Sequence, residues 1–157
     1  MIQLQYDIAV LTVDTPFHFN DFVQPVCLPE LHSETPIGTM AMVSGYGYLD
    51  YHTQEEPDTL QWARKPVISR AECQTRYPNQ ITDDMLCAAV SNGGVDSCDG
   101  DSGGPLVVID DANTATLIGV VSWEDGCGDE SPGVYSKVSH VVDWIKEAML
   151  EPAVEIV

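Results

Sequence analysis

Short apolar runs separated by turn residues form the dominant pattern of the chain. The sequence also contains 10 prolines and 12 glycines, which favour turns. The apolar runs occupy residues 39–47, 60–69, 85–89, 105–109, 117–123 and 133–138. Runs of this length, bounded by turn residues, are typical of strands. Their number and close spacing predict an all-β fold built as an antiparallel barrel.

Two segments carry helical signals. Ser69 and Glu72 have the spacing of a capping box, which predicts a short helix after residue 69. Residues 141–150 repeat their apolar side chains with a helical period and predict a terminal amphipathic helix. We expect Trp144 of this helix to pack in the core.

The segment before residue 30 predicts one further strand and a connector. Tyr6–Val13 begins with the carboxylate of Asp7 and continues as a nearly unbroken apolar run, which predicts a strand. Residues 17–29 end in Gln24-Pro25-Val26-Cys27-Leu28-Pro29, whose prolines exclude a central strand. Residues 49–58 are polar and predict a surface loop.

Length and charge narrow the class of protein. The 157 residues suit one domain, which we place at residues 1–150, followed by a tail at 151–157. The formal net charge of −19 produces a surface that repels nucleic acid and anionic membranes and attracts cationic peptides. No apolar run is long enough to span a bilayer. We therefore expect neither nucleic acid nor a membrane as a partner.

The cysteines indicate an oxidising compartment. The chain has five of them, without the Cys-x-x-Cys spacing of metal sites. We predict a secreted, extracellular protein with no metal and no cofactor. The residues that follow Met1 show no signal peptide, so the prediction of secretion requires a leader outside this chain.

The candidate chemistry lies in one stretch, Asp96-Ser97-Cys98-Asp99-Gly100-Asp101-Ser102-Gly103-Gly104-Pro105. The glycines around Ser102 leave its hydroxyl unshielded and permit backbone angles that gather amide N–H groups on one side. The amides of Gly100 and Ser102 are candidates to bind the negative oxygen of a tetrahedral intermediate. A hexapeptide Gly-Asp-Ser-Gly-Gly-Pro with a cysteine upstream is far more specific than a bare Gly-Ser-Gly turn.

This stretch resembles the nucleophile loop of the trypsin/chymotrypsin serine endopeptidases. The resemblance covers residues 1–150 and implies a chymotrypsin-like antiparallel double β-barrel. This chain would hold the second barrel, the last strands of the first and a C-terminal α-helix. The resemblance also implies that Ser102 is the nucleophile of an acyl transfer and that Gly100 helps to form the oxyanion hole.

The resemblance assigns a catalytic role to Asp7 but provides no catalytic histidine. Asp7-Ile8-Ala9-Val10 is similar to the family's Asp-Ile-Ala-Leu motif, whose buried aspartate orients that histidine. In the family this aspartate also has a hydrogen-bond partner, whose position Ser122 matches. In the family the histidine precedes this aspartate, and none of residues 1–6 is His. We assign no catalytic role to the histidines downstream, which are His18, His32, His52 and His140. We therefore expect a fragment whose histidine lies upstream, together with the activated amino terminus that pairs with Asp101 in the family.

The substrate pocket is also identified by resemblance. Asp96 stands where trypsin has its pocket-floor carboxylate, next to Ser97, which implies cleavage after Arg or Lys. Because a carboxylate in a narrow apolar slot needs a counter-charge, we expect the substrate side chain to supply it. Gly133 matches a wall glycine that leaves room for that side chain. Ser122 and Trp123 resemble the segment that pairs with the substrate backbone as an added strand.

Two acidic residues depart from the family pattern. Glu124 follows Trp123 where trypsins usually have glycine, and Asp99 stands where Gln is common. We expect these acids to favour substrates with additional positive charge near the scissile bond.

The resemblance also pairs four of the cysteines. It implies the bridges Cys73–Cys87 and Cys98–Cys127, because spacing alone does not determine a pairing. Many relatives have a further bridge where this chain has Ala41 and Val108, which implies packing in its place. Cys27 is left over. We expect it to bridge to an N-terminal segment outside this chain, and the alternative is a buried free thiol.

The sequence thus predicts a secreted trypsin-like endopeptidase, present here without its catalytic histidine. Its expected partners are protein or peptide substrates and inhibitors of serine proteases. The alternative is a non-catalytic homologue that binds partners through its acidic surface. An unrelated β-rich domain with a chance motif is a third and more remote reading.

Overall fold

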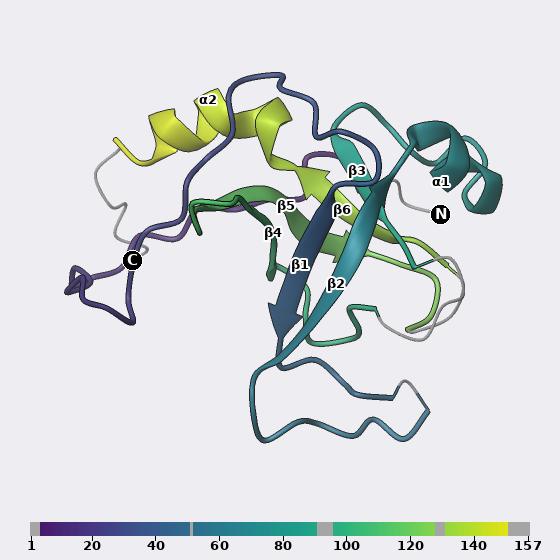
Figure 1. The fold of residues 1–157 in the computed structure, drawn as a ribbon, viewed down its shortest axis with the longest axis horizontal. Coiled ribbons are helices and arrows are strands. Elements are labelled where there is room, and N and C mark those ends of the chain that lie inside the picture. Colours follow the sequence, from purple (N-terminus) through teal and green to yellow (C-terminus); the bar gives the residue numbers. More distant parts are fainter. Residues whose placement is uncertain (1–3, 51, 91–95, 128–130, 151–157) are drawn as a thin grey trace, which may run out of the picture.

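Six antiparallel strands close into a barrel (Figure 1). This computed structural model describes residues 4–50, 52–90, 96–127 and 131–150. Around the barrel the strands follow the order β1-β2-β3-β6-β5-β4. They are β1 (Met40–Gly45), β2 (Gln61–Ile68), β3 (Met85–Ala88), β4 (Pro105–Ile109), β5 (Ala115–Trp123) and β6 (Gly133–Lys137). Each strand overlaps one of the apolar runs, so the predicted antiparallel barrel is confirmed.

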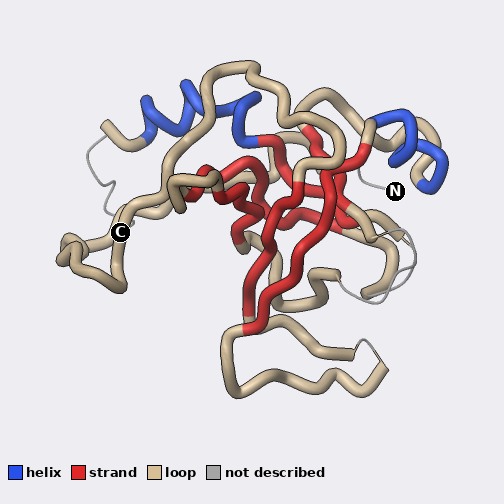
Figure 2. Tube along the Cα trace, in the orientation of Figure 1, coloured by secondary structure: helices blue, strands red, loops and turns tan. Residues whose placement is uncertain are grey.

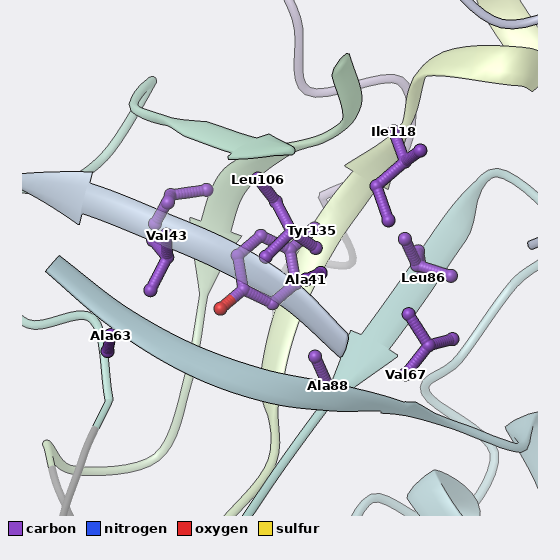
Figure 3. Packing of buried hydrophobic residues seen from close by; sticks show 10 residues of the cluster. Ala41, Val43, Ala63, Val67, Leu86, Ala88, Leu106, Ile118 and Tyr135 are labelled. Atoms are coloured by element: carbon purple, nitrogen blue, oxygen red, sulfur yellow. The ribbon is translucent and has the colours of Figure 1, made fainter. Parts of the chain in front are cut away.

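Apolar side chains from all six strands fill the barrel interior (Figure 3). This buried cluster consists of Ala41, Val43, Ala63, Val67, Leu86, Ala88, Leu106, Ile118, Val121 and Tyr135. Val108 packs against it and is partly buried. The two positions at which relatives carry a further bridge, Ala41 and Val108, are therefore held by packing, as predicted.

One inward position of the barrel carries a charge. Along β2 the side chains alternate between the two faces, since Ala63, Lys65 and Val67 are buried while Arg64 is exposed. A lysine in the middle of such an inward series is unusual, because its ammonium must find partners inside the protein. The partner of Lys65 is a residue of the candidate active site.

The short helix α1 (Arg70–Arg76) begins as its sequence predicts. The Ser69 hydroxyl accepts a hydrogen bond of 3.1 Å from the backbone N–H of Glu72, which satisfies one amide of the first turn. Cys73 on the buried side of α1 forms a disulfide with Cys87 of β3, which fastens the helix to the barrel.

The terminal helix α2 (Val138–Ala148) starts three residues before the predicted segment and lies outside the barrel (Figure 1). Its buried stripe includes Val138, Val142 and Ile145. Trp144 does not belong to this stripe and is 45% exposed, so its predicted place in the core is wrong. Within the described ranges, no helix has the length and apolar character that crossing a bilayer requires.

Residues 4–39 form no regular strand, and Figure 2 draws them as loop. The predicted strand at Tyr6–Val13 is therefore wrong. A strand is stabilised by hydrogen bonds to a neighbouring strand. Within the described residues 4–39, the isolated bridges are Asn20↔Val23 and Cys27↔Thr116, and neither involves Tyr6–Val13. The second barrel is formed, and the last strands of the first barrel are not.

The second disulfide joins the loop before Ser102 to the loop after β5, through Cys98 and Cys127, whose Cα atoms are 5.0 Å apart. Both predicted bridges are therefore present. Cys27 is free and exposed, so the alternative of a buried thiol is wrong.

Candidate active site

A tight loop before β4 presents Ser102 to solvent. Backbone hydrogen bonds run from Asp101 N to the Cys98 carbonyl at 2.9 Å and from Gly104 N to the Asp101 carbonyl at 2.8 Å. Gly103 N donates to the carbonyl of Val121 in β5 at 2.9 Å, which ties the loop to the barrel. An added Cβ at Gly104 would lie 2.7 Å from the Asp101 carbonyl oxygen, so a side chain there would break the turn.

The backbone of this loop is shaped for an acceptor at Gly100 and Ser102. Gly100 has φ +99°, a conformation that side chains disfavour. Within the described part of the chain, neither the Gly100 amide nor the Ser102 amide donates a hydrogen bond. Both residues are exposed. These two amides therefore remain available for the negative oxygen of an intermediate, and that role stays a prediction.

Asp101 is held by backbone amides. Its Oδ1 accepts from Gly47 N at 2.8 Å and its Oδ2 accepts from Cys98 N at 3.0 Å. A cavity of about 190 Å³ is lined by Asp101 and Asp96 together with residues of β1 and of the loop after it. Among the described residues no cation pairs with Asp101. The arrangement leaves this carboxylate open to a positive group from elsewhere.

Asp7 lies beside the residue that the family resemblance names as its partner. Ser122 Oγ in β5 donates to Asp7 Oδ2 at 2.6 Å, and Ser136 Oγ in β6 donates to the Asp7 carbonyl at 2.6 Å. Asp7 is exposed, whereas the resemblance implies a buried aspartate. Its segment forms no strand that would cover the carboxylate. The position next to Ser122 is as expected, and the burial is not.

Two of the four histidines lie beside each other near the start of α2. The ring centroids of His32 and His140 are 5.5 Å apart, and His140 also lies 6.1 Å from the ring of Tyr6. No hydrogen bond among the described residues joins Ser102 to Asp7, His18, His32 or His140. The structure therefore offers no catalytic base for Ser102 from these three histidines.

Asp96, the predicted pocket-floor carboxylate, has a partner that the sequence analysis did not identify. The buried ammonium of Lys65 forms an ion pair with Asp96 Oδ1, and the two side chains are 0% and 4% exposed. Lys65 Nζ also donates to Tyr135 Oη at 3.4 Å, while Asp96 accepts from Ser97 N at 2.7 Å and Ser97 Oγ at 3.2 Å. The predicted need for a counter-charge was right, but the chain itself supplies it. The available signal was a lysine at an inward position of β2.

Gly133 faces this ion pair. An added Cβ would lie 2.9 Å from Lys65 Nζ and 3.0 Å from both Asp96 Oδ1 and Tyr135 Oη. A side chain at position 133 would press against the ion pair, and glycine leaves room for the ammonium of the protein's own lysine.

Glu124 lies next to the same carboxylate. Burial, the negative charge of Asp96 and a hydrogen bond to it raise the pKa of Glu124 from its ordinary 4.5 to about 9, against the opposing effect of Lys65. Within the described structure its Oε2 is buried and has no hydrogen-bond partner. Burial, followed by the charge of Asp96, also raises the pKa of Tyr135. At neutral pH Glu124 is uncharged, so it cannot attract a basic substrate by its charge. The other predicted acidic substrate contact, Asp99, is exposed.

Trp123 at the end of β5 packs edge-on against Tyr77, with ring centroids 4.8 Å apart. This contact fixes the orientation of the strand end that the resemblance assigns to the substrate backbone, and that assignment stays a prediction. Of the predicted site residues, the structure brings Ser97, Glu124 and Gly133 together around the ion pair of Asp96 and Lys65. It places Asp7 with Ser122. No group of three or more metal-ligating side chains is found among the described residues.

Comparisons with known proteins agree with this geometry. The sequence profile of the family described as Trypsin matches residues 2–145. The chain is 42% identical over 147 residues to Transmembrane protease serine 9 from Rattus norvegicus, an alignment that covers 93% of this chain and 14% of that relative. The barrel and its serine loop define the class of chymotrypsin-like serine proteases. Within that class, the chain belongs to the trypsin family.

Proposed function

We propose that this chain carries the nucleophile and the substrate pocket of a secreted serine endopeptidase, with Ser102 as the attacking residue. The observation that carries the proposal is the loop geometry. Ser102 is exposed, and its own amide and that of Gly100 are free of hydrogen bonds to the described residues. The hydrogen bond from Ser122 to Asp7 supports the assignment of Asp7 as the carboxylate that orients the base. The histidine itself would come from sequence upstream of Asp7.

The proposed reaction follows the steps known for the trypsin family. Ser102 Oγ attacks the scissile carbonyl as the histidine removes its proton. The Gly100 and Ser102 amides stabilise the oxyanion. The protonated histidine, which Asp7 orients, then gives the proton to the leaving amine. Water attacks the acyl-enzyme by the reverse route and regenerates the Ser102 hydroxyl.

Two further parts of the proposal concern activation and compartment. We propose that a new amino terminus, released upstream by cleavage of a zymogen, brings its ammonium to Asp101. The free carboxylate at the cavity of about 190 Å³ supports this step. Both disulfides support an oxidising, extracellular compartment. Inhibitors of serine proteases are the expected protein partners besides substrates.

The preference for Arg or Lys is supported by the residue type of Asp96. It is opposed by the ion pair of Asp96 with Lys65, which already supplies the counter-charge. The same ion pair is the observation that favours the alternative function, a non-catalytic homologue that binds partners. The reactivity of Ser102 distinguishes the active endopeptidase from the non-catalytic homologue.

A fluorophosphonate probe tests the nucleophile in the full protein that contains this chain. We expect labelling of Ser102 and hydrolysis of a protein substrate. The change Ser102→Ala should abolish the labelling and lower the rate at least about a thousandfold. Absence of labelling in a folded, proteolytically activated protein would identify the non-catalytic homologue.

A further inference from the structure

We propose that Lys65 is a specificity-determining residue, whose ammonium serves Asp96 as an internal counter-ion, so that the pocket accepts an uncharged substrate side chain instead of Arg or Lys. The inference rests on the proposed function, because it names the substrate class of the same pocket. It replaces the assumption that the substrate must bring the positive charge to Asp96.

Lys65 reaches Asp96 from within the barrel wall. Its position on β2 pairs with Ala41 of β1, and its side chain is completely buried. Its ammonium contacts Asp96 Oδ1 and Tyr135 Oη, which uses two of its three donor hydrogens. Asp96 accepts further hydrogen bonds from Ser97. The hydrogen-bonding and charge requirements of the carboxylate are thus met inside the chain.

A second cation at Asp96 would be repelled by Lys65. One carboxylate would then face two positive charges in a space from which water is largely excluded, where charges interact strongly. The unpaired cation would also lose its hydration without compensation. Lys65 is held on the inward side of β2, where its side chain is completely buried. An uncharged side chain meets neither obstacle.

The inner end of the pocket is already filled. The Gly133 Cα faces Lys65 Nζ and Asp96 so closely that even a methyl group would contact both. This is the room that the family resemblance assigns to the end of a long basic side chain. A shorter, uncharged side chain would stop above the ion pair.

Glu124 adds no charge beside the ion pair of Asp96 and Lys65. Its carboxyl group interacts with Asp96 and is protonated at neutral pH, because burial and the charge of Asp96 raise its pKa. Asp96 and Lys65 then cancel each other. At Asp96 itself, no uncompensated negative charge is therefore left for a guanidinium or an ammonium.

The test compares a cation with its neutral counterpart. Benzamidine carries an amidinium similar to the head of an arginine side chain, and benzamide is uncharged. We would measure the affinity of each at neutral pH by calorimetry, with the activated full protein that contains this chain. We expect no preference for benzamidine in the unchanged chain. In Lys65→Ala we expect its affinity to rise at least about tenfold, because Asp96 gains a charge-assisted partner, while benzamide gains nothing comparable.

Arg64→Ala is the matched control, because Arg64 is the adjacent cation on β2 and points outward. It should leave both affinities unchanged. The proposal is overturned if the unchanged chain binds benzamidine at least about tenfold more tightly than benzamide, or if a folded Lys65→Ala gains no affinity for benzamidine.

A second measurement covers the case in which Lys65→Ala does not fold. Reductive methylation of the unchanged chain, read by mass spectrometry, should modify Lys146, which is 59% exposed, and leave Lys65 unmodified with or without benzamidine. Methylation of Lys65 at the rate of Lys146, or its exposure on addition of benzamidine, would overturn the proposal. Neither measurement uses Ser102 or a histidine, so a failure of the proposed function at Ser102 would be recognised separately.

Discussion

Asp96 and Asp101, two carboxylates of the loop before Ser102, are stabilised in opposite ways. Asp96 is paired with the buried ammonium of Lys65, whereas Asp101 accepts hydrogen bonds from the amides of Gly47 and Cys98. Both carboxylates line a cavity of about 190 Å³, but among the described residues only Asp96 has a cation beside it. The barrel therefore closes the first carboxylate and leaves the second open. The source of the counter-charge, rather than the residue type, distinguishes the two sites.

The largest effect should come from breaking the closed site. Lys65→Met and Asp96→Asn each leave one buried charge without its partner, which should lower the free energy of unfolding by about 3–5 kcal/mol. The double variant should recover most of this loss, because no unpaired charge remains. Denaturant titrations of the oxidised chain would measure the three values.

The exposed ion pair of Arg70 and Asp83 provides the control for this comparison. Its side chains are 48% and 80% exposed, and Asp83→Asn should cost less than about 1 kcal/mol. If Lys65→Met cost no more than Asp83→Asn, the buried pair would not hold the closed site together.

The second effect is a dependence of stability on pH that originates at Glu124. Its pKa is raised to about 9 in the folded chain and returns to about 4.5 on unfolding. Between these values the folded chain binds the extra proton. The free energy of unfolding should then fall with rising pH by up to about 1.4 kcal/mol per pH unit. The charged and titratable groups around Glu124 are Asp96, Lys65, Asp101, Tyr77 and Tyr135.

Denaturant titrations between pH 5 and pH 9 would measure this slope. Glu124→Gln should flatten it, because glutamine does not titrate. Asp99→Asn removes an exposed acid of the neighbouring loop and should leave the slope unchanged. A slope that persists in Glu124→Gln would assign the proton to another group.

The third effect tests the open site. The peptide Ile-Val-Gly-Gly, added as a separate molecule, should bring its ammonium to Asp101 and stabilise the chain by about 1.4 kcal/mol at ten times its dissociation constant. Thermal unfolding would measure the shift. The N-acetylated peptide lacks the charge and should have no effect, and Asp101→Asn should remove the effect of the free peptide. Equal shifts with both peptides would show that Asp101 is not the binding group.

Local signals in the sequence were sufficient for most of the barrel. The helix α1 begins where Ser69 and Glu72 have capping-box spacing, since this interaction lies within four consecutive residues. The six strands coincide with the apolar runs, because the apolar side chains of these runs are buried inside one barrel. The disulfides were identified by resemblance, because spacing alone leaves several pairings open.

The remaining errors have a common physical origin in distant contacts. Tyr6–Val13 has the composition of a strand, but a strand needs a hydrogen-bonded neighbour. The segment that contains Trp144 has a helical period, but only packing determines which stripe of α2 is buried. Lys65 was visible as an inward residue of β2, but the closed barrel is what brings it to Asp96. Each outcome depends on a residue far away along the chain.

The smallest effect concerns Asp7, the exposed carboxylate of the proposed site. Ser122→Ala removes the hydrogen bond to its Oδ2, which should cost about 0.5–1.5 kcal/mol of local stability. Because Tyr6 N donates to Asp84 Oδ2 at 2.7 Å in the same segment, hydrogen exchange of the Tyr6 amide should become a few-fold faster. Ser136→Ala removes the bond to the Asp7 carbonyl and serves for comparison. If only Ser136→Ala accelerates exchange, the backbone contact holds this segment, and Ser122 acts on the carboxylate alone.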